Sequence, residues 1–245
     1  MGTNELEFFQ KQMESNINRA SQGGVVLTHF LDEQKQAFLS QMRSQDVDIH
    51  LEGGFENAEH KRAVFVPRYL NKFDFKIKVY EILYNKRYLT LHHRKVLGSL
   101  LGLGIKRESI GDIIFQNDLV YFACTQEISA YIEQNLTTIS GIPISLKEVE
   151  ERIVAESKMQ EQFHIVSSLR LDVLVASAYH ISRSDAQTMI TEGLVLLNHM
   201  ECKNSSKILQ NNDIISVRHK GRFCLKEIEG KTRSERLKVT LSFWV

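Results

Sequence analysis

The feature that most constrains this chain lies near its C-terminus, where two short amphipathic helices are followed by strands that carry basic residues. The sequence Ser-Leu-Arg-Leu-Asp occupies residues 168–172, and Ser-Arg-Ser-Asp occupies residues 182–185. A glycine and an apolar run follow at residues 193–198, and an alternating apolar and basic stretch covers residues 213–223. Helices, a tight turn and basic strands in this order indicate a compact surface that fits folded RNA. Nucleic-acid binding is therefore the leading interpretation.

Local signals define the second of these helices. The Ser182 hydroxyl can accept a hydrogen bond from the amide of Asp185, and the Asp185 carboxylate can reach back to the amide of Ser182, as in a capping box. A buried stripe follows, formed by Ala186, Met189 and Ile190. Gly193 lies where a left-handed C-terminal cap is needed. These signals together predict a short helix that begins at Ser182 and ends before Gly193.

The first helix is predicted to start at Ser167 or Ser168, with Arg170 pointing outward at its first turn. Its inward positions are Leu171, Leu174, Val175 and Ala178. The N-termini of the two helices, flanked by Arg170 and Arg183, would then offer backbone amides and cations to phosphate groups.

The charge of the chain is distributed unevenly, although its formal net value is only +1. Residues 168–245 carry 12 basic and 8 acidic residues, whereas the rest of the chain carries 19 basic and 22 acidic residues. A basic surface at the C-terminal end favours an anionic partner for this part of the chain. The hydrophobic fraction of 42% and the charged fraction of 25% argue against broad disorder.

The predicted fold class is α+β, with an N-terminal α/β region at residues 1–70 and a middle domain at residues 71–150. A connector is expected at residues 151–165, followed by a C-terminal domain at residues 166–245. The middle domain reads as β-α-β-β-α-β, which is the ferredoxin-like arrangement that RNA-recognition modules share. Its expected elements are strands at 75–84, 111–116, 119–125 and 144–149, and helices at 92–101 and 126–136.

The N-terminal region is expected to hold two or three helices over residues 4–45, broken near Gly23 and Gly24, and then strands at residues 46–51 and 61–67. In the middle domain, Tyr121 and Phe122 only faintly echo the aromatic residues with which RNA-recognition modules stack bases. The topology alone therefore does not assign an RNA site to this domain.

The full C-terminal pattern resembles the RNA-binding module named after ribosomal small-subunit protein four, here called the S-four domain. The segments that carry the resemblance are Arg170-Leu-Asp172, Ser182-Arg183, Gly193-Leu-Val195 with Asn198, Asp213–Arg218 and Gly221-Arg-Phe223. In such domains the two helices and the following strand face RNA. The resemblance implies that the RNA-facing residues are Arg170, Ser182, Arg183 and Gln187, and that the phosphate contacts are Lys203, Arg218, Lys220 and Arg222.

Two upstream segments, at residues 53–62 and 93–112, come before the S-four domain in the chain. Together, the two segments and the S-four domain look like the YlmH family of Gram-positive bacteria, across nearly the full length of the chain. This resemblance implies a cytoplasmic factor of ribosome-associated quality control. Its implied partners are rRNA and tRNA on stalled large subunits that carry peptidyl-tRNA, and an elongation factor of the RqcH type, with no DNA and no membrane. The family has also been tied to cell division.

A glycine-containing run over residues 98–107 invites comparison with a phosphate-binding loop. It lacks the terminal Gly-Lys-Ser/Thr and follows a helix instead of a strand, so we interpret it as a helix end. Lys106 and Arg107 are predicted to lie on the surface there as a secondary RNA contact.

Two other functions stay open. An RNA-modifying enzyme of the pseudouridine synthase or methyltransferase type is one, because Arg170-Leu-Asp172 mimics a pseudouridine synthase motif; a cell-division factor that binds proteins is the other. No catalytic residue, cofactor or metal is expected, since three scattered cysteines form no Cys-x-x-Cys pair and no glycine-rich dinucleotide turn follows an N-terminal strand. No apolar run reaches the roughly 20 residues that span a bilayer, which favours a cytoplasmic location.

Overall fold

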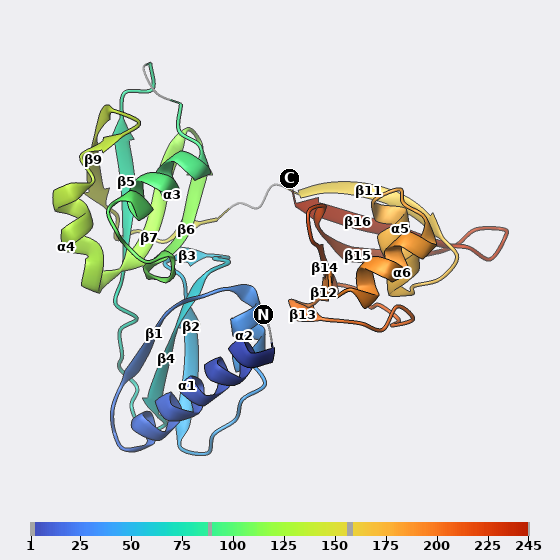
Figure 1. Cartoon of the computed structure of the whole chain (residues 1–245), viewed down its shortest axis with the longest axis horizontal. Helices are drawn as coiled ribbons and strands as arrows, with labels where there is room; N and C mark the ends of the chain where they lie inside the picture. The colour runs from blue at the N-terminus through green and yellow to red at the C-terminus, as the bar shows by residue number, and fades with distance from the viewer. Residues whose placement is uncertain (1–2, 88–89, 156–158, 245) are drawn as a thin grey trace. The chain divides into compact units, whose positions relative to one another are not determined.

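The computed structural model describes residues 3–87, 90–155 and 159–244, and it divides the chain into two compact units, Met1–Glu156 and Ser157–Val245 (Figure 1). Both units combine helices with antiparallel sheets, which confirms the predicted α+β class. Within the described residues, no helix has the length and apolar content needed to cross a bilayer.

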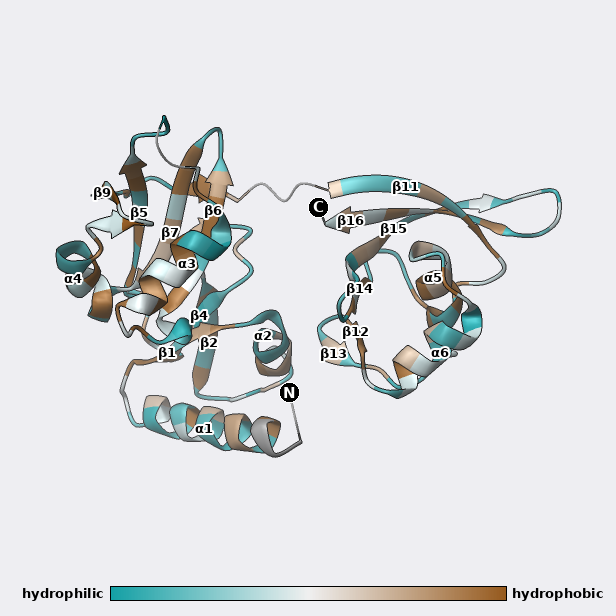
Figure 2. Ribbon diagram, turned by 45° about the horizontal axis from the view of Figure 1, so that its top comes forward, coloured by the Kyte–Doolittle hydropathy of each residue, from teal (hydrophilic) through white to brown (hydrophobic). Residues whose placement is uncertain are grey.

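The first lobe of the N-terminal unit is a three-stranded sheet in the order β1-β4-β2, with two helices. Its elements are α1 (Thr3–Ser21), β1 (Val26–Leu31), α2 (Glu33–Leu39), β2 (Val47–Glu52), β3 (Phe55–Glu56) and β4 (Lys61–Pro67). Hydrophilic and hydrophobic residues alternate along α1 (Figure 2), because one face of this helix packs on the sheet through Phe9, Met13 and Ala20.

The prediction of two or three helices over residues 4–45 is wrong in one place. Residues 26–31 form strand β1, which pairs antiparallel with β4. Phe30 and Leu31, which fall within the range predicted as helical, are both buried in this strand. Val26 and Thr28 of this strand are β-branched, which suits a strand, and pairing with the distant strand β4 decides the conformation of so short a segment.

The second lobe of the unit has a sheet in the order β6-β7-β5-β9-β8, with every neighbouring pair antiparallel. Its elements are β5 (Ile77–Tyr84), α3 (His93–Gly102), the 3-10 helix η1 (Arg107–Ser109), β6 (Ile110–Gln116), β7 (Leu119–Thr125), α4 (Gln126–Asn135), β8 (Thr138–Ile139) and β9 (Ile142–Glu148). The order β6-β7-β5-β9 is that of a βαββαβ unit with ferredoxin-like topology. Asn117 and Asp118, with φ of 50° and 62°, make the tight turn between β6 and β7.

The two faces of this second sheet have different coverings. Helices α3 and α4 cover one face (Figure 1), where Val96, Leu100 and Ile132 pack on buried residues that include Phe122. The other face packs against the first lobe through a shared core, formed by Phe30, Phe55, Ala58, Val79, Ile114 and Ala123. Tyr121 lies partly buried against that core. The first lobe therefore covers part of the helix-free face, the face that RNA-recognition modules use to stack bases.

A single close contact illustrates how tightly the two lobes join. A Cβ atom at Gly111 would lie only 2.7 Å from the Phe30 ring, so only glycine permits this approach. Polar contacts also join the two lobes. The buried Arg62 of β4 donates hydrogen bonds to the carbonyls of Thr28 and Lys76, and it forms an ion pair with Glu127 at 2.6 Å.

A short pair of strands adds to these contacts. Strand β10 (Ile153–Val154), which follows the second lobe in the chain, pairs in parallel with β3 of the first lobe.

The C-terminal unit is a six-stranded antiparallel sheet, in the order β11-β16-β15-β14-β12-β13, with two helices packed on it. Its elements are β11 (Met159–Val166), α5 (Leu171–Ala178), α6 (Arg183–Thr191), β12 (Val195–Leu197), β13 (Met200–Glu201), β14 (Ile214–Val217), β15 (Gly221–Lys231) and β16 (Leu237–Trp244). The predicted inward residues of both helices lie in its core, most of them fully buried.

The predicted connector at residues 151–165 contains the boundary between the two units, but most of its described residues lie in strands. Residues 153–154 form β10, and β11 occupies residues 159–166 and pairs along its whole length with β16. The polar composition of this segment suggested a linker. It becomes a strand because the end of the chain, about 80 residues away in sequence, supplies its pairing partner.

Candidate nucleic-acid interface

The site is organised around Asp172, a fully buried residue in the first turn of α5. Arg170, the residue at the N-cap of α5, donates from Nε to Oδ1 at 3.0 Å and from Nη2 to Oδ2 at 2.9 Å. Arg183, the first residue of α6, donates from Nε to Oδ2 at 3.0 Å, and Gln187 donates from Nε2 to the same oxygen at 2.7 Å. One carboxylate thus positions three side chains from two helices.

This arrangement keeps Asp172 ionised. Burial alone would raise the pKa of Asp172, but hydrogen bonds from Arg170, Gln187 and Arg183 outweigh it and hold the pKa well below its ordinary value. The exposed fractions of the Arg170 and Arg183 side chains are 28% and 53%. Because two guanidinium groups share one carboxylate, the cluster carries a net positive charge, and both arginines remain within reach of an external anion.

The N-terminus of α5 differs from its prediction. The N-cap is Arg170 and not Ser167 or Ser168, and Arg170 makes no capping bond with its side chain. The amide of Leu171 donates instead to the carbonyl of Lys207 at 2.8 Å, and the amide of Asp172 donates to the carbonyl of Ser205 at 3.1 Å. These amides are therefore not available to a phosphate group, which corrects the interpretation that both helix N-termini could bind one.

The same loop adds a basic residue that the sequence analysis missed. Residues 204–208 run beside the start of α5, and Ile208 forms a bridge with Arg170. Lys207 in this loop is exposed, and its backbone carbonyl accepts from the amide of Leu171, so it adds a basic residue beside the start of α5. In the sequence, Lys207 follows a polar stretch and precedes Ile208 and Leu209, and no local pattern connects it to Arg170, 37 residues earlier.

The second helix begins and ends as predicted. The Ser182 hydroxyl accepts a hydrogen bond from the amide of Asp185 at 3.0 Å, so this side chain caps the N-terminus of α6. Gly193 has φ of 74°; its amide donates to the carbonyl of Ile190 and that of Leu194 donates to the carbonyl of Met189, which is a Schellman motif. Both ends of α6 are thereby fixed, and with them the position of Arg183.

The other basic residues predicted to contact RNA lie in separate surroundings. Lys203 forms an ion pair with Glu201 at 3.1 Å. Arg218 is exposed in the turn between β14 and β15, and the Lys220 ammonium lies 5.9 Å from the centre of the Tyr179 ring.

Arg222 is directed away from the cluster around Asp172. Its neighbour Phe223 is fully buried beneath α5 and α6, and side chains alternate between the faces of a strand. The Arg222 guanidinium lies 4.5 Å from the centre of the Trp244 ring on the opposite face. The structure therefore brings Arg170, Arg183 and Gln187 together, and it does not bring Arg222 to them.

The two residues predicted as a secondary RNA contact in the N-terminal unit, Lys106 and Arg107, differ in their exposure. Lys106 is exposed, but the Arg107 guanidinium is partly buried, donates to the carbonyl of Ile110 and lies 3.3 Å from Nε2 of His60. Burial lowers the pKa of Arg107 from its ordinary value. His60 in turn contacts Asp112 through Nδ1 at 2.7 Å. Arg107 thus links the two lobes, and its side chain is only partly exposed on the surface where it was predicted to lie.

The resemblance of residues 170–172 to a pseudouridine synthase motif has no counterpart in the geometry. The Asp172 carboxylate is inaccessible to solvent, and both of its oxygens accept hydrogen bonds from neighbouring side chains. In this arrangement the aspartate orients cations and does not face a substrate.

The sequence and the fold of the chain are similar to those of known proteins. Residues 71–152 match the family described as "Putative RNA-binding domain in YlmH", and residues 169–215 match the S-four (S4) domain. A protein of Bacillus subtilis (strain 168), ribosome-associated protein quality control protein P2, is 32% identical over 241 residues, which cover 96% of this chain and 94% of that protein. The solved structure of cell division protein YlmH from Streptococcus pneumoniae has 26% identity and a TM-score of 0.51, over 61% of this chain and 93% of that one.

The fold and the two matching families define a protein of the S-four-domain class, with the S-four domain following a second domain associated with RNA. Over nearly its full length, the chain belongs to the YlmH family.

Proposed function

We propose that this protein is a non-catalytic RNA-binding factor of ribosome-associated quality control. Its C-terminal unit would bind rRNA and tRNA on stalled large ribosomal subunits that carry peptidyl-tRNA, in the cytoplasm and together with an elongation factor of the RqcH type. The observation that carries this proposal is the cluster around Asp172, in which Arg170, Arg183 and Gln187 are oriented before any ligand arrives. The S-four match and the quality-control relative support it.

Preorganised arginines suit folded RNA for a physical reason. Guanidinium groups form paired hydrogen bonds with phosphate oxygens, and side chains that are already ordered lose little conformational entropy on binding. Contacts of this kind set the position of the protein on the RNA and make its affinity depend on salt. Arg218 and Lys220, together with Lys207, would add further phosphate contacts around the cluster.

The experiment compares binding of the full-length chain to purified bacterial large subunits, with and without peptidyl-tRNA, by co-sedimentation. The test variant is Arg183→Ala/Lys207→Ala/Lys220→Ala. This variant leaves the ion pair between Arg170 and Asp172 intact. A change of Arg170 to an acidic residue is avoided, because it would place a second carboxylate beside the buried Asp172 and destabilise the fold. Each lost phosphate contact should reduce the slope of log affinity against log salt by about 0.7–0.9, so the slope of the triple variant should fall by about 2–3.

The control is Lys11→Ala/Lys72→Ala/Lys86→Ala, which removes the same charge from exposed positions in the N-terminal unit. It should bind as the wild type does. If both triple variants lose affinity equally, or if neither loses any, the C-terminal cluster is not the ribosomal contact. Equal binding to subunits with and without peptidyl-tRNA would retain the RNA surface and refute the preference for stalled subunits.

A further inference from the structure

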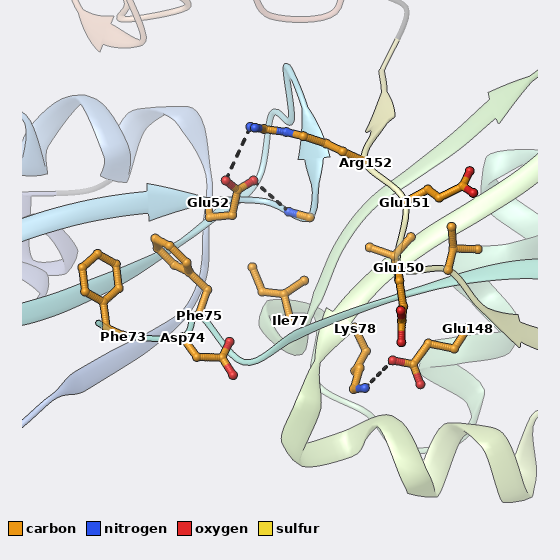
Figure 3. Close-up of a pocket in the computed structure, with 13 residues that line it drawn as sticks. Glu52, Phe73, Asp74, Phe75, Ile77, Lys78, Glu148, Glu150, Glu151 and Arg152 are labelled. Carbon is orange, nitrogen blue, oxygen red and sulfur yellow. Dashed lines mark hydrogen bonds and ion pairs between the residues drawn. The ribbon is translucent and has the colours of Figure 1, made fainter. Parts of the chain in front are cut away.

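A groove of about 590 Å³ opens between the two lobes of the N-terminal unit (Figure 3). Three chain segments line it: the end of β2 and the turn after it at residues 52–54, the stretch that leads into β5 at residues 73–79, and the end of β9 with the residues after it at 148–152. It belongs to a different unit from the cluster around Asp172. The proposed RNA surface therefore leaves it without a role.

The floor of the groove is apolar and firmly held. Its apolar lining residues are Phe73, Phe75, Ile77, Val79 and Val149. The Phe73 ring stacks on the His50 ring at 4.7 Å and meets the Phe75 ring edge-on at 5.7 Å. Gly54, with φ of 85°, lets the turn approach Ile77 so closely that a Cβ there would lie 2.9 Å from its side chain. The aromatic surface is thus supported from behind while it lines an open groove.

The rim of the groove is acidic. Five carboxylates line it against two cations; the carboxylates are Glu52, Asp74, Glu148, Glu150 and Glu151, and the cations are Lys78 and Arg152. Both cations are already paired, Lys78 with Glu148 and Arg152 with Glu52 at 3.7 Å (Figure 3). Two hydrogen bonds from Lys76 lower the pKa of Asp74; the one from its side chain has the larger effect, and the one from its backbone amide has the smaller.

Two of these carboxylates have no cation of their own. Glu150 and Glu151 are exposed, and within the described part of the chain neither forms a hydrogen bond or an ion pair. They stand beside an apolar floor, so a ligand that satisfied them would bring cationic groups and apolar groups together. A phosphate backbone carries the wrong charge for this rim, because each phosphate would be repelled by several carboxylates.

We propose that this groove binds a basic peptide segment of a protein partner, in which arginine or lysine residues alternate with apolar ones. The apolar side chains would lie on Phe73 and Phe75, and the cationic side chains would reach Glu150 and Glu151. Such complementarity sets the rate of association and the choice of partner. The chain would then carry two surfaces of opposite charge, a basic one for RNA in the C-terminal unit and an acidic one for protein in the N-terminal unit.

The test is fluorescence anisotropy of the full-length chain with a labelled peptide of alternating arginine and leucine. A peptide of alternating arginine and serine measures the contribution of charge alone, and one of alternating glutamine and leucine, which carries no charge, measures that of apolar contact alone. The arginine–leucine peptide should bind more tightly than both. In Glu150→Lys/Glu151→Lys its affinity should fall at least about tenfold, because two attractive rim charges become repulsive ones.

The matched control is Glu7→Lys/Glu14→Lys, which makes the same change of charge on the exposed side of α1. Its affinity should stay within about twofold of the wild type. Co-sedimentation with large subunits should be unaffected in Glu150→Lys/Glu151→Lys, which separates this groove from the RNA surface. Equal losses in the two double variants, no binding of the arginine–leucine peptide, or tighter binding of an RNA oligonucleotide at the groove would each overturn the proposal.

Discussion

The substitution Asp172→Asn removes one charge from the centre of the proposed RNA surface without changing the shape of the side chain. Four hydrogen bonds from Arg170, Arg183 and Gln187 converge on the carboxylate. Asparagine retains one oxygen as an acceptor and presents N–H groups to the remaining donors. The substitution should therefore leave part of the Arg170 fork unsatisfied in a region that is largely shielded from water.

The size of the effect follows from how far each cation is exposed. Removing one partner of a buried ion pair costs about 3–5 kcal/mol, whereas pairs at the surface contribute about 1 kcal/mol or less. The Arg183 side chain is 53% exposed and can regain its hydration, but Arg170 is only 28% exposed and Asp172 is fully buried. We therefore expect the free energy of unfolding of the C-terminal unit to fall by about 3 kcal/mol, at the lower end of the range for buried pairs.

Differential scanning calorimetry of the full-length chain measures this loss. For a unit of this size, 1 kcal/mol corresponds to about 4–8 °C, so the transition of the C-terminal unit should move down by about 12–24 °C. Asp185→Asn is the matched control, because Asp185 is exposed and lies in the first turn of α6, where its charge contributes at most about 1 kcal/mol. If Asp172→Asn melts within the range of the control, Asp172 does not organise the cluster.

Two further predictions concern stability. Burial lowers the pKa of His164 below its ordinary value of 6.5, so below that pH the unfolded chain binds a proton that the folded chain excludes. The stability of the C-terminal unit should be fully present above about pH 6.5 and fall as the pH is lowered, and His164→Gln should flatten this dependence in urea titrations; an unchanged slope would contradict the assignment. Gly111→Ala should destabilise the N-terminal unit by about 1–3 kcal/mol through its clash with Phe30. Gly98→Ala is the control, because a Cβ atom at Gly98 in helix α3 would have no atom within 4 Å. In thermal melts this variant should be as stable as the wild type or more stable by up to about 1 kcal/mol. Equal effects of the two glycine variants would refute the packing argument.

The elements that the sequence predicted correctly share one property, which is that their signals are local. The turn at Asn117 and Asp118, the cap at Ser182 and the left-handed Gly193 each depend on residues a few positions apart. The order of strands and helices in the second lobe follows from such signals. So do the buried stripes of α5 and α6, because helical periodicity identifies the face of a helix before its packing partner is known.

The sites that the sequence missed depend on distant partners. Strand β1 pairs with β4, and β11 pairs with β16, across long stretches of chain. Side-chain partners behave in the same way: the sequence placed Arg170 and Arg183 on an RNA-facing surface, but it did not reveal that both would share Asp172. Arg222 is a basic residue of the kind that contacts phosphate groups. It lies beside Trp244, away from the Asp172 cluster, because the adjacent Phe223 is buried on the other face of the strand.

By itself, the sequence determined the fold class, most helices and strands, and the position of the basic C-terminal domain, because backbone preferences and apolar periodicity act over a few residues. Only the tertiary structure decided which charges meet. The Asp172 cluster requires two helices to pack together, and the acidic groove requires residues 52, 75 and 150 to converge from three segments. Electrostatic interactions depend on distance in space and on burial, and neither quantity exists until the chain has folded.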